Sequence, residues 1–389
     1  MMAHALASVL LVGSIGALSS RAFAALPASG CELVPAGQFG PVSQEEVRAE
    51  TVVSGLEVPW AIAFLPGSRD LLVTERPGRV RLVRAGKLVE RPVLTVPVAG
   101  RSEGGVLGLA LDPEFVRNRR FFLYRTLEKS GRQVNRLESY VLAPDSATAR
   151  VEKVLLDDIP AERYHDGGRL RFGSDRLLYL GTGDAGAPPL ARRRDSLAGK
   201  ILRLAPDGAI PPTNPFPGSP VFVMGLRNVQ AFDWRSDGAL VVADHGPSGE
   251  LGRRGHDRVL VVPRAAGADL GWPDAYGCEA LPGMPPPALS WVDAVPPGGA
   301  SFYTGDAIPA WRGSLLVGTL GSRHLHRVAF RAERVERHEV VLRGEPPQGL
   351  GRLREVVMGP DGALWITTSN CDGRGSCPPE KDRIVRIVR

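Results

Sequence analysis

One pattern recurs along this chain: an apolar strand, a tight turn, and a second apolar strand that ends in small or polar residues. The turns usually combine Gly with Asp or Ser, and most copies are followed by a third strand of the same type. Self-similarity of this kind indicates one supersecondary unit used many times. The six copies cover residues 60–75, 107–125, 168–184, 229–245, 300–319 and 356–369. The repeat predicts a fold built from antiparallel meanders.

Six such meanders, with almost no amphipathic helix between them, predict an all-β fold: a six-bladed β-propeller of four-stranded antiparallel sheets. A sandwich of two or more β-domains is the alternative, but no linker or shift in composition divides the 389 residues. We expect an N-terminal extension over residues 25–50 and the propeller over residues 51–389. The long Pro/Gly-rich loops at 185–195, 210–221 and 267–297 are expected to cluster on one face, where propellers build their sites.

Composition excludes several classes of protein. Hydrophobic residues make up 43% and charged residues 23% of the chain, which is typical of a globular protein and not of a disordered one. The net charge is +6, yet no block of like charge and no basic stripe interleaved with aromatic residues occurs, so nucleic-acid binding is not expected. Beyond the N-terminal apolar run, no segment is long and apolar enough to span a membrane.

The N-terminus has the character of an export signal. Residues 5–18 form an apolar run that is too short for a stable membrane anchor, and residues 22–24 (Ala-Phe-Ala) fit a signal-peptidase site. The sequence therefore predicts a signal peptide over residues 1–24 and a periplasmic or secreted mature protein. Residues 28–31 (Ala-Ser-Gly-Cys) also form a degenerate lipid-attachment box, but its distance from the apolar run disfavours lipid anchoring at Cys31.

Four cysteines in an exported chain suggest disulfides. Cys371 and Cys377 bracket a turn-forming loop that would close easily, which predicts a disulfide between them. A zinc site is the rival interpretation, but no nearby His or Cys completes four ligands. Pairing of Cys31 with Cys278 is a hypothesis without local support.

The copy over residues 168–184 is the one that a histidine precedes closely. His165 opens its first strand and Asp184 ends its second, so both lie at one end of a hairpin although 19 residues separate them. An imidazole held by a carboxylate is the usual composition of a general base. The pair Gly167 and Gly168 would let another group approach the backbone closely. The alternative is that His165 is a polar residue with satisfied hydrogen bonds and no function.

Other polar groups also gather at strand ends. Residues 227–230 carry three polar side chains directly before an apolar strand, although a solvated loop would explain them too. In residues 244–247, carbonyls next to Gly and Pro could turn outward as oxygen ligands for Ca²⁺, or simply form a tight turn. In residues 352–354, alternation places two guanidinium groups on one strand face, where they could bind carboxylates or phosphates or face solvent. Trp291 is a lone aromatic in a loop, for which core packing is the simple explanation.

Taken together and in this order, these stretches resemble the soluble quinoprotein glucose/sorbosone dehydrogenases. That family consists of six-bladed propellers that use pyrroloquinoline quinone (PQQ) and Ca²⁺ to oxidise aldoses. The resemblance covers about residues 53–387, and the ordered set of motifs is specific although each motif alone is weak. The matching segments are residues 58–64, 103–109, 165–169, 197–203, 214–216, 227–230, 245–247, 271–273, 303–306 and 352–354.

The resemblance implies a role for each motif. His165 would be the catalytic base that takes the proton from the anomeric hydroxyl, Asp184 the carboxylate that orients it, and Arg227 the cation that stabilises charge on the quinone oxygens. The other matched residues would bind the cofactors: Glu103, Asn228 and Gln230 as polar groups lining PQQ, Arg352 and Arg354 as a clamp on its carboxylates, Trp291 as the aromatic packed on its face, and the Gly246 and Pro247 carbonyls as Ca²⁺ ligands.

The sequence also departs from the family pattern. Gly321 stands where the family can carry a Lys, with Arg323 as the nearest candidate substitute. The stretch after residues 245–247 is rewritten over residues 248–259, where Asp257 is the candidate for the family's Glu and Val259 removes an Asn.

Three functions therefore stay open. The favoured one is a PQQ- and Ca²⁺-dependent aldose dehydrogenase with an external electron acceptor, because the base, its helper and the arginine pair are intact. The others are a cofactor-free propeller that binds carbohydrate or protein, and a Ca²⁺-dependent lactonase-type hydrolase with Asp184 and Asp244 as metal ligands.

Overall fold

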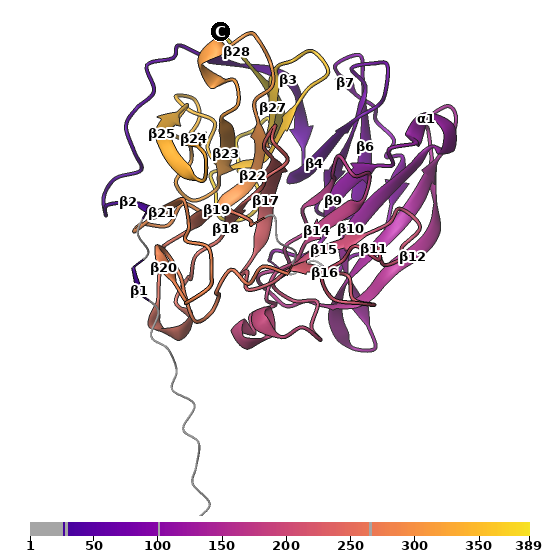
Figure 1. Ribbon diagram of the computed structural model, residues 1–389. Coiled ribbons are helices and arrows are strands. Elements are labelled where there is room, and N and C mark those ends of the chain that lie inside the picture. Colours follow the sequence, from indigo (N-terminus) through magenta and orange to yellow (C-terminus); the bar gives the residue numbers. More distant parts are fainter. Residues whose placement is uncertain (1–25, 28–29, 100–101, 264–266) are drawn as a thin grey trace, which may run out of the picture.

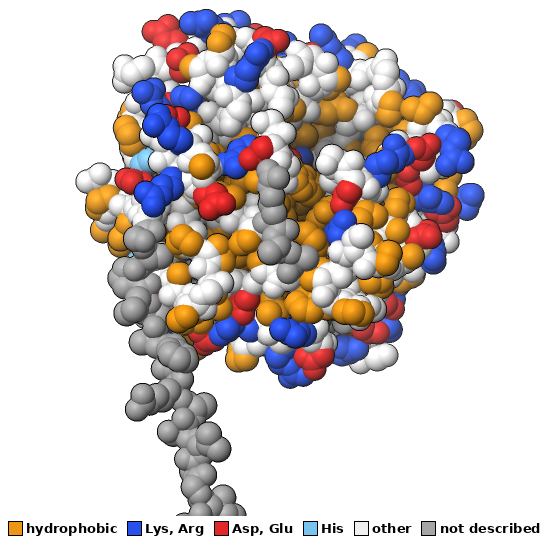
Figure 2. Space-filling view, viewed as in Figure 1, with side chains coloured by type: hydrophobic (Ala, Val, Ile, Leu, Met, Phe, Trp, Pro, Cys, Tyr) orange, Lys and Arg blue, Asp and Glu red, His pale blue; other side chains and the backbone are white. Residues whose placement is uncertain are grey.

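Six small antiparallel sheets form a six-bladed β-propeller, as the sequence predicts (Figure 1). The structure is a computed structural model that describes residues 26–27, 30–99, 102–263 and 267–389, so the predicted signal peptide lies outside the described residues. None of the helices in these ranges is long and apolar enough to cross a membrane. Lys and Arg side chains are interspersed with Asp and Glu on the face shown in Figure 2, in agreement with the absence of charge blocks in the sequence.

The first three blades follow one another along the chain, each beginning with the first strand of a predicted repeat. The first blade contains β4 (Pro59–Phe64), β5 (Leu71–Glu75), β6 (Arg79–Arg84), β7 (Lys87–Leu88) and β8 (Leu94–Thr95). The second contains β9 (Val106–Leu111), β10 (Arg120–Lys129), β11 (Arg132–Leu142) and β12 (Ala149–Pro160). The third contains β13 (Leu170–Phe172), β14 (Leu178–Gly181), β15 (Ile201–Leu204) and β16 (Val221–Val223).

Two of the other three blades incorporate strands from the N-terminal part of the chain. The fourth contains β17 (Val229–Trp234), β18 (Leu240–Asp244), β19 (Arg258–Val261), β21 (Leu289–Trp291) and β2 (Glu32–Val34). The fifth contains β22 (Pro297–Phe302), β23 (Leu315–Thr319), β24 (Leu325–Arg331) and β25 (Arg334–Val341). The sixth contains β26 (Leu353–Met358), β27 (Leu364–Thr368), β28 (Asp382–Val388) and β3 (Arg48–Leu56).

The helical segments among the described residues are short. They are α1 (Phe115–Asn118) and the 3₁₀ turns η1 (Pro188–Arg192), η2 (Glu250–Gly252) and η3 (Pro309–Trp311). The strand pairs β4–β5, β9–β10, β13–β14, β17–β18, β22–β23 and β26–β27 coincide with the six predicted repeats.

Strand β3 closes the ring. It pairs antiparallel with β28, with Val53 opposite Ile384, so the sixth blade is built from both ends of the chain. Closure of this kind joins the first and last blades and completes the ring.

The segment before β3 crosses the outer edges of two blades. Strand β2 pairs parallel with β21, and Val42 forms a bridge with Val340 at the edge of the fifth blade. β1 (Leu26–Pro27) pairs with β20 (Glu279–Ala280), next to a disulfide between Cys31 and Cys278. The predicted disulfide between Cys371 and Cys377 is also present. Because the Cys31 sulfur is bonded to Cys278, it is not free to carry a thioether-linked lipid.

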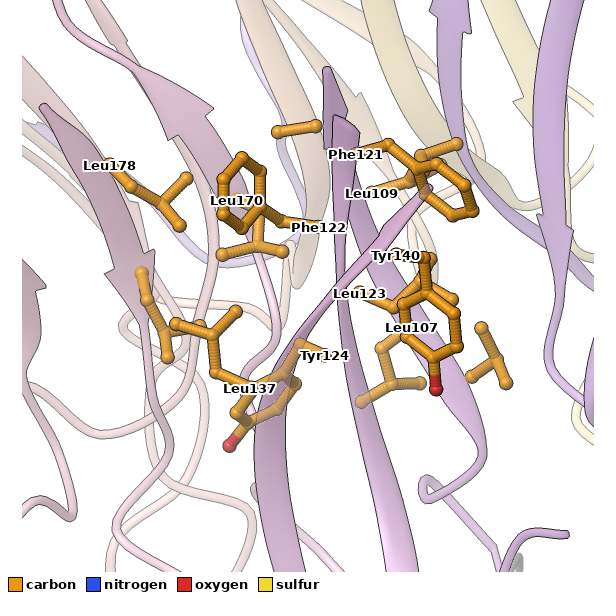
Figure 3. Close-up of a cluster of buried hydrophobic side chains, with 14 of the residues drawn as sticks. Leu107, Leu109, Phe121, Phe122, Leu123, Tyr124, Leu137, Tyr140, Leu170 and Leu178 are labelled. Atoms are coloured by element: carbon orange, nitrogen blue, oxygen red, sulfur yellow. The ribbon is translucent and has the colours of Figure 1, made fainter. Parts of the chain in front are cut away.

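The core between the second and third blades positions the histidine loop. Phe122, Leu123 and Tyr124 of β10 are fully buried in a cluster with side chains of β9, β11, β13 and β14 (Figure 3). The Tyr124 hydroxyl donates a hydrogen bond of 3.0 Å to the backbone carbonyl of Asp166. This hydrogen bond therefore holds Asp166, the residue that follows His165, against the core.

The three long loops contact one another, as expected. Arg192 forms an ion pair of 2.8 Å with Asp269, and the Arg194 guanidinium lies 4.9 Å from the ring of Phe216. The first of these loops is tied down by Lys200, whose buried ammonium donates to three backbone carbonyls of residues 190–198. Burial lowers the pKa of Lys200 to about 7.

Candidate active site

His165 and Asp184 form a hydrogen-bonded pair. Strand β13 begins only at Leu170, so the expectation that His165 opens the strand is wrong: it lies in the preceding loop with a φ of 67°. Its Nδ1 is 2.7 Å from Asp184 Oδ1. The other carboxylate oxygen of Asp184 accepts a hydrogen bond of 2.8 Å from the Trp272 indole. Since a carboxylate can only accept, the Nδ1 that faces Asp184 carries a proton.

The loops that carry the pair pack backbone against backbone. A Cβ at Gly183 would lie 1.7 Å from the His165 carbonyl oxygen, and one at Gly167 would lie 2.5 Å from the Thr182 backbone. The glycines beside His165 thus allow the two strand ends to approach each other. The His165 amide donates to Glu103 Oε2 at 2.9 Å, which helps to hold the left-handed backbone conformation of His165.

An inner cavity of about 150 Å³ brings together most of the residues singled out in the sequence. It is lined by Trp60, Glu103, His165, Asp166, Gly167, Arg227, Gln230, His245, Ser248, Pro296, Leu320, Arg352, Arg354 and Arg374. An outer cavity of about 860 Å³ shares Glu103, His165, Ser248 and Arg374 with it and adds Tyr164, residues 185–187 and Glu250. His165 therefore lies where the two cavities meet.

The arginines of the inner cavity are buried and mostly paired. Arg352 Nη2 is 2.7 Å from Asp372, and Arg374 Nη1 is 2.9 Å from Glu103. Burial lowers the pKa of Arg354 to about 9; its Nη1 donates to the Gln230 side chain, while its buried Nε has no hydrogen-bond partner. The pKa of Glu103 is lowered to about 2, because attraction to Arg374 and hydrogen bonds outweigh the raising effect of burial.

Carboxylates hold both the side chain and the backbone amide of Arg227. Its side chain is 1% exposed, and its Nε donates a hydrogen bond of 2.9 Å to Glu250 Oε1. Its backbone amide and that of Asn228 donate to the buried Asp244 carboxylate at 3.0–3.1 Å. Asn228 itself accepts from the Gly167 amide at 2.9 Å, so it positions the histidine loop and is not among the cavity-lining residues.

Several residues at the site were not predicted from the sequence. Glu250 Oε1 is 3.5 Å from His165 Nε2, and the only signal for it was the rewritten stretch over residues 248–259. Asp166 is buried at the cavity wall, where burial raises its pKa to about 7. His245 is held neutral, because burial lowers its pKa to about 3, and its Nε2 is 2.7 Å from the Pro297 carbonyl oxygen.

The structure does not bring Trp291 to the cavity. It lies in β21, is 2% exposed, donates to the Phe39 carbonyl and meets the ring of His326 edge-on at 4.9 Å. This is the core-packing alternative, and Trp60 is the tryptophan that lines the cavity instead. Arg323 does not replace the missing Lys at Gly321 either, because it pairs with Glu345 at 2.8 Å and is absent from the lining.

The turn at Gly246 and Pro247 follows His245 and is held by Asp257. Asp257 accepts hydrogen bonds from the amides of Gly246 (2.9 Å) and Val295 (2.7 Å), and burial raises its pKa to about 6. Within the described ranges, no group of three or more His, Cys, Asp or Glu side chains could hold a metal ion. A cation at this turn would therefore depend on backbone carbonyls and on oxygens of a bound ligand.

Asp184 and Asp244, the acidic ligands that a lactonase-type hydrolase would need, are already engaged. Asp184 accepts from His165, Trp272 and the Gly186 amide. Asp244 accepts from two backbone amides and from Arg258 at 3.2 Å. This arrangement disfavours the hydrolase hypothesis.

A closed β-propeller with a His–Asp pair and a cluster of arginines around one cavity defines a class of enzyme scaffold. The chain belongs to the Glucose / Sorbosone dehydrogenase family, whose sequence profile matches residues 56–385.

Its relatives are similar over most of their length. The aldose sugar dehydrogenase YliI of Escherichia coli is 30% identical over 84% of this chain and 91% of that protein. The PQQ-bound aldose sugar dehydrogenase of Streptomyces coelicolor superimposes with a TM-score of 0.78 at 32% identity, covering 90% and 99% of the two chains. An oxidoreductase of Thermus thermophilus that has been assigned as a glucose dehydrogenase superimposes with a TM-score of 0.80 at 41% identity, covering 88% and 100%.

Proposed function

We propose that this protein is a PQQ- and Ca²⁺-dependent dehydrogenase that oxidises the anomeric hydroxyl of aldose sugars to the lactone and passes the electrons to an external acceptor. The observation that carries the proposal is the position of His165. Asp184 holds its Nδ1, and the ring borders the same cavity as Arg227, Arg352 and Arg354. Membership of the family and the similarity to a PQQ-bound relative support the same function.

The inner cavity fits a flat, anionic quinone. PQQ carries three carboxylates, and guanidinium groups are good receptors for carboxylates. Arg352, Arg354 and Arg374 line the cavity beside Trp60, and the buried Nε of Arg354 still lacks a hydrogen-bond partner. A buried donor without a partner in a residue that lines a cavity is what an anionic ligand would satisfy.

Each residue around the sugar would have a separate role in its oxidation. His165 Nε2 would take the proton of the anomeric hydroxyl, and Asp184 would stabilise the imidazolium that results. When bound, PQQ supplies the quinone that accepts the hydride from the anomeric carbon. Arg227 would hold charge that develops on the quinone side of the cavity, in a buried position where such stabilisation is strongest.

The outer cavity is the proposed entrance and binding place of the sugar. Tyr164 lines it and is 41% exposed, and the apolar face of a sugar ring can pack against an aromatic ring there. Glu103 and Glu250 also line this cavity and offer acceptors for sugar hydroxyls.

Calcium would bind at the Gly246 and Pro247 carbonyls, with the cofactor supplying further oxygens. Asp257 would not contact the ion but would keep the turn in shape through its hydrogen bond to the Gly246 amide. We further propose that the mature protein is periplasmic or secreted, which agrees with its two disulfides.

The test is reconstitution. Purified protein is incubated with PQQ and Ca²⁺, and dye reduction is followed with a panel of aldoses. Sugar-dependent reduction that requires both cofactors is the expected result. No PQQ binding by calorimetry, together with no turnover of any sugar, would overturn the proposal.

A further inference from the structure

Three of the four arginines that line the inner cavity are paired with carboxylates of the protein itself. Arg352 is paired with Asp372, Arg374 with Glu103, and Arg227 with Glu250. An anionic ligand that is to contact Arg227, Arg352 or Arg374 must displace the carboxylate that is paired with that arginine. The question is which of the three carboxylates can leave.

Glu250 lies between Arg227 and His165, the two residues that the cofactor and the sugar would contact. Its Oε1 accepts from Arg227 Nε at 2.9 Å and lies 3.5 Å from His165 Nε2. Under the proposed function, the quinone must face Arg227 and the sugar hydroxyl must face His165 Nε2. A carboxylate between these two groups excludes both ligands from their contacts.

Glu250 is also the most exposed of the three carboxylates. Its side chain is 23% exposed, against 16% for Glu103 and 2% for Asp372. Glu103 is fixed by the His165 amide, and Asp372 accepts from Ser369 Oγ and from the amide of Arg374. The second oxygen of Glu250, by contrast, accepts only within its own turn, from the Ser248 amide at 2.5 Å.

The turn places the Glu250 side chain next to open space. Glu250 begins the short 3₁₀ turn η2, between Gly249 with a φ of 133° and Leu251 with a φ of 54°. Its side chain already lines the outer cavity, so a rotation away from Arg227 moves it into open space.

We propose that Glu250 is an internal anion that occupies Arg227 in the free protein and is displaced by PQQ, so that this residue sets the affinity for the cofactor. The inference rests on the proposed function. In the free state Glu250 neutralises a buried guanidinium that would otherwise lack a counter-ion. On binding, the cofactor takes over Arg227, and the Glu250 carboxylate turns to the outer cavity, beside the sugar.

The experiment measures PQQ binding by calorimetry in the presence of Ca²⁺ for the wild type, Glu250→Gln and Glu162→Gln. Glutamine keeps the size of the side chain but not the charge that competes for Arg227. Glu250→Gln is expected to bind PQQ about tenfold more tightly, within the range usual for coupled binding events. Glu162→Gln removes a charge from the same outer cavity without touching Arg227, and its Kd is expected to match that of the wild type.

Glu250→Asp is a second variant, which retains the charge but is one methylene too short for Arg227. Its affinity for PQQ is expected to lie between those of the wild type and Glu250→Gln. If the glutamine variant does not fold, Glu250→Asp alone tests the displacement. Equal or weaker binding by the Glu250 variants would overturn the displacement. Failure of all proteins, the wild type included, to bind PQQ would instead overturn the proposed function.

Discussion

The indole of Trp272 donates a hydrogen bond of 2.8 Å to Asp184, although 88 residues separate the two in the chain. The carboxylate that orients His165 is thus held by a loop that follows β19 in the next blade. The orientation of the imidazole therefore depends on contact between two blades and not on its own hairpin alone.

Trp272→Phe is expected to lower turnover by roughly 10- to 100-fold, because a hydrogen bond to a charged group contributes about 1.5–3 kcal/mol. Phenylalanine retains most of the buried ring while leaving Asp184 Oδ2 without its partner. Steady-state rates of the reconstituted enzyme measure the effect. Trp291→Phe is the matched control, since it also loses a buried indole hydrogen bond but does not line the cavity, and its rate should stay near that of the wild type.

His165→Ala is expected to reduce turnover by about 10²- to 10⁴-fold, the usual contribution of general-base catalysis, while PQQ still binds. His256→Ala provides the comparison, because His256 also has a positive φ (62°) yet lies outside both cavities. Single-turnover rates and calorimetry separate chemistry from binding. Loss of PQQ binding in His165→Ala would contradict its assignment as a base.

Asp166 should make stability depend on pH. Burial raises its pKa from 3.8 to about 7, so the folded protein holds this proton more tightly than the unfolded chain. Stability is then lost as pH rises through this window. Asp166→Asn keeps the acceptor for the Asn135 amide and removes the titration.

Thermal unfolding of Asp166→Asn and the wild type at several pH values tests this. Relative to that of the wild type, the free energy of unfolding of the variant should increase between pH 5 and 8, by on the order of 3 kcal/mol at most. Parallel curves for the two proteins would show that Asp166 does not hold the proton.

Arg352→Gln is expected to weaken PQQ binding by roughly tenfold or more, because a charge-assisted hydrogen bond to a carboxylate is lost. Arg323→Gln tests whether the nearest arginine to Gly321 compensates for the absent Lys. Since Arg323 pairs with Glu345 outside the cavity, its removal should leave the Kd unchanged. A tenfold weaker Kd for Arg323→Gln would show that it reaches the cofactor.

The parts of the structure that sequence predicts well are those fixed by neighbours in the chain. The six strand pairs follow from alternation and turn residues, and the meeting of His165 with Asp184 follows from hairpin geometry. The role of β3 could not be derived in this way, because its partner β28 lies at the other end of the chain. The expected boundary at residue 51 accordingly falls inside a strand that spans Arg48–Leu56.

Side-chain placement is harder to predict. The motif around Trp291 assigns it to the cofactor, but whether a tryptophan faces a cavity or the core depends on packing between blades. Glu250 escapes prediction because its position is set by two unusual backbone conformations on either side of it, at Gly249 and Leu251, which no periodicity reveals.

The sixth blade takes three strands from the C-terminus and one from the N-terminus. A chain that lacks β28 therefore has no partner for β3, and its ring of blades cannot close. Assembly of the sugar-oxidising site must wait for β28 to be synthesised, so termination before this strand would leave an open scaffold that holds Arg352 and Arg354 loosely.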